Sequence, residues 1–263
     1  MKNQNVNIVA INIVKVLLAA IALFLSVQLL TVNVEAEPGI AYDTANTSSD
    51  AVDLITRSNS VADALYKSAV VAEMKISLTE MQASNEETVG WLLIPNVCYY
   101  PIMYSSVYDY YLTHDPNREA SAQGSIFINY QCEASFENML TLIHGHNMKN
   151  GAMFGQLEEY LGEDFFNNNS KIMILSDGQL RSYKPFTVVI LEENSDVIDA
   201  RELSDTERIS YIESMYNRSV CKLKEGEELD LTKPVIFFST CNYSFSEARL
   251  LVGAYLTQIE EVG

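Results

Sequence analysis

Beyond Gly90 the sequence is a succession of short β-like runs separated by turn residues, and this pattern restricts most of the chain to a β fold. Eight such segments predict a closed or nearly closed β-barrel. No internal repeat interrupts the succession. The runs cover residues 91–94, 100–104, 125–130, 139–144, 171–175, 186–191, 235–239 and 249–256.

Two helical patterns lie between the β-like runs. One follows Gly151, where apolar residues recur at a spacing of four (Met153, Leu157 and Leu161). The other begins at a capping box, Ser204 to Glu207, in the connection that leads to the run at 235–239. The predicted fold class is therefore mainly β with added helices.

The segment before the barrel also has helical patterning. Asp50 is a candidate cap for a first helix, and Ser60 with Asp63 resembles the capping-box start of a second. The second pattern carries one apolar stripe that is expected to pack on a neighbouring element. The stripe consists of Val61, Leu65, Ala69, Ala72 and Ile76.

The N-terminal region is almost continuously apolar over residues 8–32, long enough to cross a bilayer core of about 30 Å. Lys2 precedes this stretch, whereas Glu35 and Glu37 follow it, which predicts an N-terminus inside the cell and the rest outside. A cleavable signal peptide is the competing interpretation. Both interpretations export the remainder of the chain.

These patterns divide the chain into four parts. We expect a cytoplasmic tip and transmembrane anchor at 1–33 and a linker at 34–49. An N-terminal helical segment follows at 50–85, and the β-barrel domain at 86–263.

Charge and cysteine spacing exclude several functions. With 17 basic against 35 acidic residues the formal charge is −18, so nucleic acid is not an expected partner. The four cysteines form no C-x-x-C pair and there are only three histidines, which argues against a structural zinc site. Cys98 is expected to be a buried core residue, whereas Cys132 and Cys221 lie in polar surroundings.

Three groups of residues carry chemistry. His146 follows the apolar run at 139–144, Cys241 follows the run at 235–239, and Arg249 opens the last run. A thiolate is a strong nucleophile, an imidazole can donate or accept the proton that acyl transfer needs, and a guanidinium can stabilise an oxyanion. Together these side chains can perform acyl transfer.

The order of these motifs resembles the sortase family, and the residues around them resemble class B. The similarity spans roughly residues 86–257. It rests on residues 90–95, 100–102, 110–115 and 124–127, the histidine block Gly145–Met148 with Met153–Phe154, the nucleophile block Ser239–Cys241, and the arginine block Ala248–Arg249.

The resemblance implies an eight-stranded sortase-type barrel, with N-terminal helices and a helix in the loop before the nucleophile strand. It implies that Cys241, His146 and Arg249 are catalytic and that Ser239, Thr240 and Asn147 bind substrate. The activity implied is cleavage of a C-terminal sorting motif at a threonine carbonyl, without metal or organic cofactor. The implied partners are secreted proteins with such a motif, and an amine of peptidoglycan, of a lipid-linked precursor or of a pilin lysine.

Four positions depart from the family pattern. Phe237 and Phe238 stand where Thr-Leu is usual, and Asn129 stands where class B members commonly carry Asp. His144 precedes the Gly-His pair where an aromatic or small residue is more usual. We interpret His144 as a residue without a catalytic role. It is the less favoured alternative to His146 as the general acid.

Two alternatives remain open. An exported cysteine peptidase would use water as acceptor, but papain-like enzymes place Cys before His, the reverse of the order here. A non-catalytic adhesion or pilus scaffold would be expected to end in its own sorting motif, whereas this sequence ends Gln-Ile-Glu-Glu-Val-Gly.

Overall fold

The computed structural model describes residues 44–192, 203–242 and 248–262 of the chain. The chain divides into two compact units, Met1–Glu73 and Met74–Gly263, and each is described by itself. None of the described helices is long and apolar enough to cross a membrane. The predicted anchor at 8–32 lies outside the described residues.

One continuous helix, α2 (Thr44–Ser84), replaces the two helices expected here. The segment contains neither Gly nor Pro, so nothing in it breaks the helix at Ser60. The predicted contact stripe is also wrong, because Val61, Leu65 and Ile76 are 58%, 54% and 56% exposed. Met74 and Leu78 are buried instead. These two residues are one helical turn apart and lie on a different face from the predicted stripe. Periodicity alone did not show which face other residues would cover.

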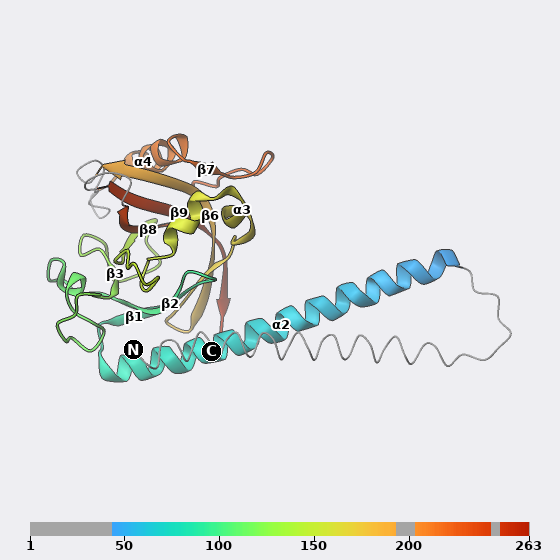
Figure 1. The fold of residues 1–263 in the computed structure, drawn as a ribbon, viewed down its shortest axis with the longest axis horizontal. Coiled ribbons are helices and arrows are strands. Elements are labelled where there is room, and N and C mark those ends of the chain that lie inside the picture. The colour runs from blue at the N-terminus through green and yellow to red at the C-terminus, as the bar shows by residue number, and fades with distance from the viewer. Residues whose placement is uncertain (1–43, 193–202, 243–247, 263) are drawn as a thin grey trace. The chain divides into compact units, whose positions relative to one another are not determined.

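The second unit is built on a nine-stranded sheet whose ends meet (Figure 1). The strand order is β5-β1-β2-β3-β4-β8-β9-β6-β7, and an additional β5–β6 pairing closes a ring of eight, with the two-residue β7 outside it. This confirms the predicted eight-stranded barrel. The strands are β1 (Thr88–Ile94), β2 (Cys98–Met103), β3 (Ile126–Ile128), β4 (Leu140–His144), β5 (Ile172–Ser176), β6 (Gln179–Glu192), β7 (Cys221–Lys222), β8 (Val235–Asn242) and β9 (Ala248–Glu261).

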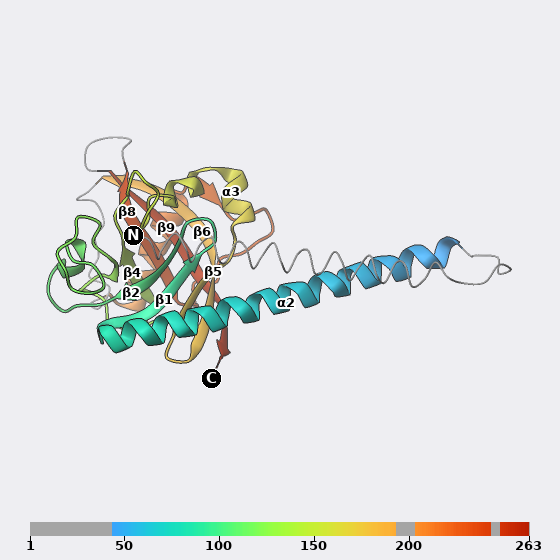
Figure 2. The same cartoon turned by 60° about the horizontal axis from the view of Figure 1, so that its bottom comes forward.

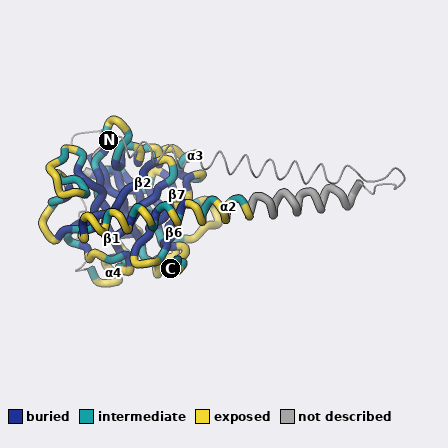
Figure 3. The backbone as a smooth tube through the Cα atoms, turned by 90° about the horizontal axis from the view of Figure 1, so that it is seen from below, coloured by how far each residue is buried: buried dark blue, intermediate teal, exposed yellow. Residues whose placement is uncertain are grey.

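Two buried layers flank the strands β4, β8 and β9. Inside the barrel, Ile143, Phe238 and Leu250 belong to a large apolar core. On the outer surface, Phe237 and Leu251 pack with residues of helix α4 in a second core. Figure 3 shows the barrel strands as the most buried part of the chain. Alternation along each strand therefore assigns neighbouring residues to opposite layers.

Helix α4 (Asp205–Asn217) lies in the connection before β8, as predicted (Figure 1). Ser204 caps it in a full capping box with Glu207. The pattern after Gly151 instead forms a 3₁₀ helix, η2 (Leu157–Leu161), followed by the short α3 (Glu163–Asn168). Gly151 and Met153 both have positive φ, at 77° and 54°, so the backbone there cannot continue an α-helix.

Candidate active site

Two strand ends bring the sequence-predicted residues together at one edge of the barrel. β4 and β8 run parallel, so both end at this edge, and His144 is the register partner of Ser239. Cys241 lies two residues beyond Ser239, and its register partner across the antiparallel β8–β9 pair is Arg249. Residues far apart in sequence thus meet because adjacent strands share their pairing. Figure 2 shows β4, β8, β9 and β6 from the side.

Pairing on both sides fixes the place of Arg249. The β8–β9 register runs without a shift from Val235↔Tyr255 to Asn242↔Ala248. On its other side Arg249 is the partner of Leu191 in β6. The half-buried Arg249 therefore has little freedom to slide along the strand. The predicted orientation of the Cys241 side chain lies outside the described residues.

His146 lies just beyond the end of β4, on a backbone held by two hydrogen bonds. The Gly145 amide donates to the Ser239 carbonyl at 3.2 Å, and the Phe154 amide donates to the His146 carbonyl at 3.0 Å. A side chain at Gly145 would meet the Phe154 ring at 2.7 Å, so glycine is required for this step.

The His146 ring is held by the 3₁₀ helix η1 (Tyr110–Leu112). Its Nε2 lies 2.8 Å from the Leu112 carbonyl oxygen. A carbonyl only accepts, so Nε2 carries the proton and Nδ1 is the nitrogen available for proton transfer. η1 itself is anchored by Tyr111, whose hydroxyl donates to Glu87 at 2.5 Å and accepts from Asn85 at 2.8 Å.

His144 makes a contact that sequence reasoning missed. Its Nε2 lies 2.8 Å from Asn129 Nδ2, and its ring centroid is 5.4 Å from that of Phe127. Burial, with a smaller contribution from the positive Arg249, lowers the pKa of His144 to about 4. The available signal was that Asn129 and His144 both depart from the family pattern, which suggests a pair.

The predicted substrate-binding residues are all buried. Ser239 is the partner of His144, whereas Thr240 pairs with Leu250 of the inner core and so lies on the opposite sheet face. The Asn147 side-chain amide donates to Glu158 at 3.0 Å. None of these contacts tests substrate binding, so that role of the three residues stays a prediction.

The other cysteines are all buried and free of disulfides. This agrees with the expectation for Cys98, where burial raises the thiol pKa. Cys132 and Cys221 are buried as well, although their neighbours in sequence are polar. Burial first, and Glu163 second, raise the pKa of Cys221. Among the described residues, no three His, Cys, Asp or Glu side chains are placed to hold a metal.

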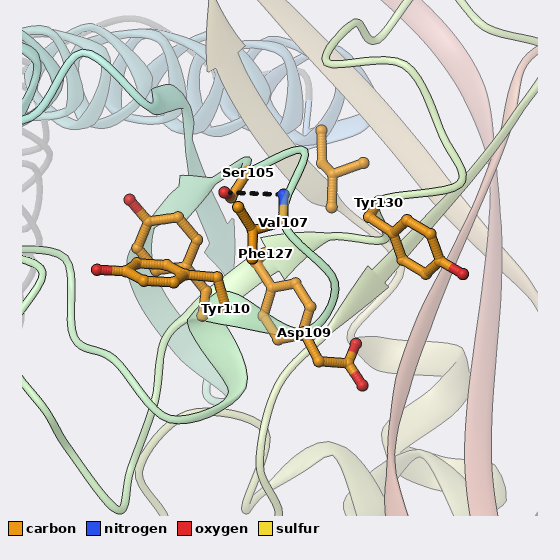
Figure 4. A pocket seen from close by; sticks show the side chains of 8 residues that line it. Ser105, Val107, Asp109, Tyr110, Phe127 and Tyr130 are labelled. Carbon is orange, nitrogen blue, oxygen red and sulfur yellow. Dashed lines mark hydrogen bonds between the residues drawn. The ribbon is translucent and has the colours of Figure 1, made fainter.

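A shallow hollow adjoins the site (Figure 4). Phe127, which contacts the His144 ring, lines it together with Tyr110 of η1 and Tyr130. Tyr130 packs edge-on against the exposed Tyr108, with ring centroids 5.0 Å apart. The hollow is therefore lined by a residue that contacts His144 and by a residue of the helix that holds His146.

Comparisons of sequence and of structure with known proteins point to the same family. Searched against family models, the chain matches none. It is 31% identical to sortase B of Listeria monocytogenes over 188 residues, covering 70% of this chain and 75% of that protein. The crystal structure of sortase B from Bacillus anthracis in complex with AAEK2 is 30% identical, with a TM-score of 0.62, and the match covers 69% of this chain and 82% of that one.

A third comparison supports the fold alone. Sortase B of Clostridium perfringens is 24% identical, with a TM-score of 0.64. The match covers 68% of this chain and 99% of that chain.

Proposed function

The chain belongs to the sortase B family of cysteine transpeptidases, and on this premise we propose that Cys241, His146 and Arg249 carry out the reaction. The register pair Cys241↔Arg249, beside the strand end that carries His144 and leads to His146, is the observation that supports this assignment most. A thiol and a permanent cation on register partners are suitably arranged to act on the same carbonyl group.

In the first half-reaction, the Cys241 thiolate attacks the carbonyl carbon of a threonine in the sorting motif. Arg249 stabilises the negative oxygen of the tetrahedral intermediate. The carbon–nitrogen bond then breaks. His146, which starts this half-reaction as the imidazolium, donates the proton on Nδ1 to the departing amine and becomes neutral, while Nε2 stays bonded to the Leu112 carbonyl. A thioester on Cys241 and a free amine result.

In the second half-reaction, an acceptor amine attacks the thioester carbonyl. His146 takes up the proton that the amine loses, and the carbon–sulfur bond breaks to restore the thiolate. We propose an amine of peptidoglycan, of its lipid-linked precursor or of a pilin lysine as acceptor. The acyl donors are secreted proteins with a C-terminal sorting motif. The chemistry requires no metal or organic cofactor.

A peptide-library assay tests this function. The full-length chain in detergent is incubated with threonine-containing peptides, with and without added amine, and the products are identified by mass spectrometry. Cleavage after threonine, with an amide product only when amine is present, is expected. Cleavage at the same rate with water as the only acceptor would instead indicate a cysteine peptidase.

The location of the enzyme follows from the apolar N-terminus. We propose a single-pass membrane protein with its barrel outside the cell, anchored by residues 8–32. Fractionation should place the mature protein in the membrane, with Lys171 and later residues open to external protease. Mature protein that begins near Glu37 and is recovered from the medium would contradict the anchor.

Arg249→Lys is expected to lower kcat/KM by about 10²-fold or more. The substitution keeps the charge, but a compact ammonium lacks the planar set of donors of a guanidinium. Steady-state kinetics on the best-cleaved library peptide measure the effect. Lys222→Arg, a basic exchange in β7, is the matched control and should leave kcat/KM unchanged. Near-normal turnover by a folded Arg249→Lys variant would remove Arg249 from the mechanism.

A further inference from the structure

Asn129 has a fixed orientation beside His144. Its Oδ1 accepts a hydrogen bond from the Gln131 amide at 2.8 Å, so the other end of the side chain is the NH₂ group. Main-chain bonds hold the residue on both sides: its amide donates to Leu142 at 2.9 Å, and its carbonyl accepts from Cys132 at 2.8 Å. The side chain is buried, 5% exposed, and cannot readily turn over.

This orientation fixes the protonation of the His144 ring. The Asn129 NH₂ group, 2.8 Å from Nε2, can only donate, so Nε2 must be an unprotonated acceptor. A neutral imidazole then carries its proton on Nδ1. His146 has the opposite arrangement, because its Nε2 donates to Leu112. The two histidines are thus held in different tautomers.

The surroundings keep His144 neutral. Its register neighbours are Phe127 of β3 and Ser239 of β8, and the charged group that acts on it is Arg249 of β9. Burial is the larger cost of charging the ring, and a second positive charge beside Arg249 adds to this cost. The ring therefore stays a neutral donor at pH values well above its pKa of about 4.

We propose that His144 is a substrate-positioning residue whose Nδ1–H donates a hydrogen bond to a backbone carbonyl of the bound acyl-donor peptide. This inference rests on the proposed function. A peptide whose threonine carbonyl reaches Cys241 must pass the end of β8, where His144 is the partner of Ser239. The peptide's own carbonyls need donors there, since the β4 and β8 backbones already bond to each other.

By fixing the tautomer of His144, Asn129 also prevents a hydrogen bond between His144 and Arg249. Arginine is only a donor, and Nδ1–H is also a donor, so neither can accept from the other. In the opposite tautomer, Nδ1 would be an acceptor able to compete with substrate for the guanidinium. Asn129 thus leaves Nδ1–H of His144 as a donor for a peptide carbonyl.

Nitrogen NMR tests the tautomer without any substrate. The full-length chain in detergent micelles is labelled with ¹⁵N at histidine, which gives three ring systems. We expect His144 to be neutral and Nδ1-protonated from about pH 5.5 to 8, more than one unit above its lowered pKa. In Asn129→Leu this fixed tautomer should be lost. A proton on Nε2 of His144 in the unsubstituted protein would overturn the proposal.

Kinetics test the contact with substrate. His144→Phe is expected to raise the KM of the best-cleaved library peptide about fivefold to tenfold, as loss of one hydrogen bond predicts, with kcat within about twofold. The KM of the acceptor amine should not change. His144→Gln, which keeps a donor, should recover part of the effect. Lys222→Arg, the exchange in β7, is again the control and should leave all constants unchanged.

The outcomes separate this inference from the proposed function. Unchanged peptide KM in a folded His144→Phe variant overturns the inference while transpeptidation stands. A fall in kcat as large as that of His146→Ala also overturns it, because His144 would then transfer protons. If the unsubstituted protein cleaves no library peptide, the proposed function fails and the substrate contact with it, whereas the NMR result still decides the tautomer.

Discussion

Cys241→Ala is expected to eliminate both cleavage of the sorting motif and amine-dependent ligation, lowering turnover by at least about 10⁴-fold. Without the thiol no thioester forms, and no other cysteine can replace it, because Cys98, Cys132 and Cys221 are all buried. Steady-state rates on the best-cleaved library peptide measure the loss. Hydroxylamine added to the unsubstituted enzyme should trap the acyl group as a hydroxamate at the motif threonine.

Cys132→Ala is the matched control for this experiment. Cys132 is 1% exposed, so the substitution removes a buried thiol but no reacting group, and activity should stay nearly intact in protein that remains folded. Substitution of Cys98 or Cys221 should give the same result. If Cys241→Ala still cleaved the motif, or if the acyl group were found on another cysteine, the sortase mechanism assigned here would be wrong.

His146→Ala should reduce turnover by about 10²- to 10⁴-fold, since general acid–base catalysis contributes that much. His144→Ala should leave kcat mostly intact. The physical reason is that the Asn129 amide occupies Nε2 of His144, whose pKa of about 4 makes its ring almost wholly neutral at pH 7. A neutral Nδ1–H is a weak acid compared with an imidazolium.

Parallel pH–rate profiles of the two variants decide between the histidines. The His144→Ala profile should keep the limbs of the unsubstituted enzyme, and the His146→Ala profile should lose one of them. Circular dichroism of each variant controls for folding. The reverse assignment, with His144→Ala inactive and His146→Ala active, would mean that the Gly-His block has been matched to the family incorrectly.

The barrel could be predicted because each of its strands is marked by residues that are close together in the sequence. Eight short runs separated by turn residues specify strands and little else, and the capping box at Ser204 specifies the start of α4. The long N-terminal helix was less predictable. A sequence such as Ser60–Asp63 is favourable at a helix start, but it is also tolerated within a helix when no Gly or Pro is present.

Features that depend on long-range pairing could not be derived in this way. Burial of Cys132 and Cys221 follows from strands and loops that cover them, whereas their sequence neighbours are polar. The orientation of Asn129 toward His144 depends on a turn at Gln131 and on the pairing of β3 with β4. Motif order predicted the residues of the candidate site, but not the hydrogen bonds that set their tautomers.

The position of β9 in the ring has a consequence for when the enzyme becomes competent. β9 lies between β8 and β6 and carries Arg249, and it follows β8 in the chain, so Arg249 is synthesised after its register partner Cys241. A chain in which β8 has formed but β9 has not yet paired contains the thiol without the cation across from it. If Arg249 acts as proposed, acyl transfer therefore waits for the pairing of β9 with β8.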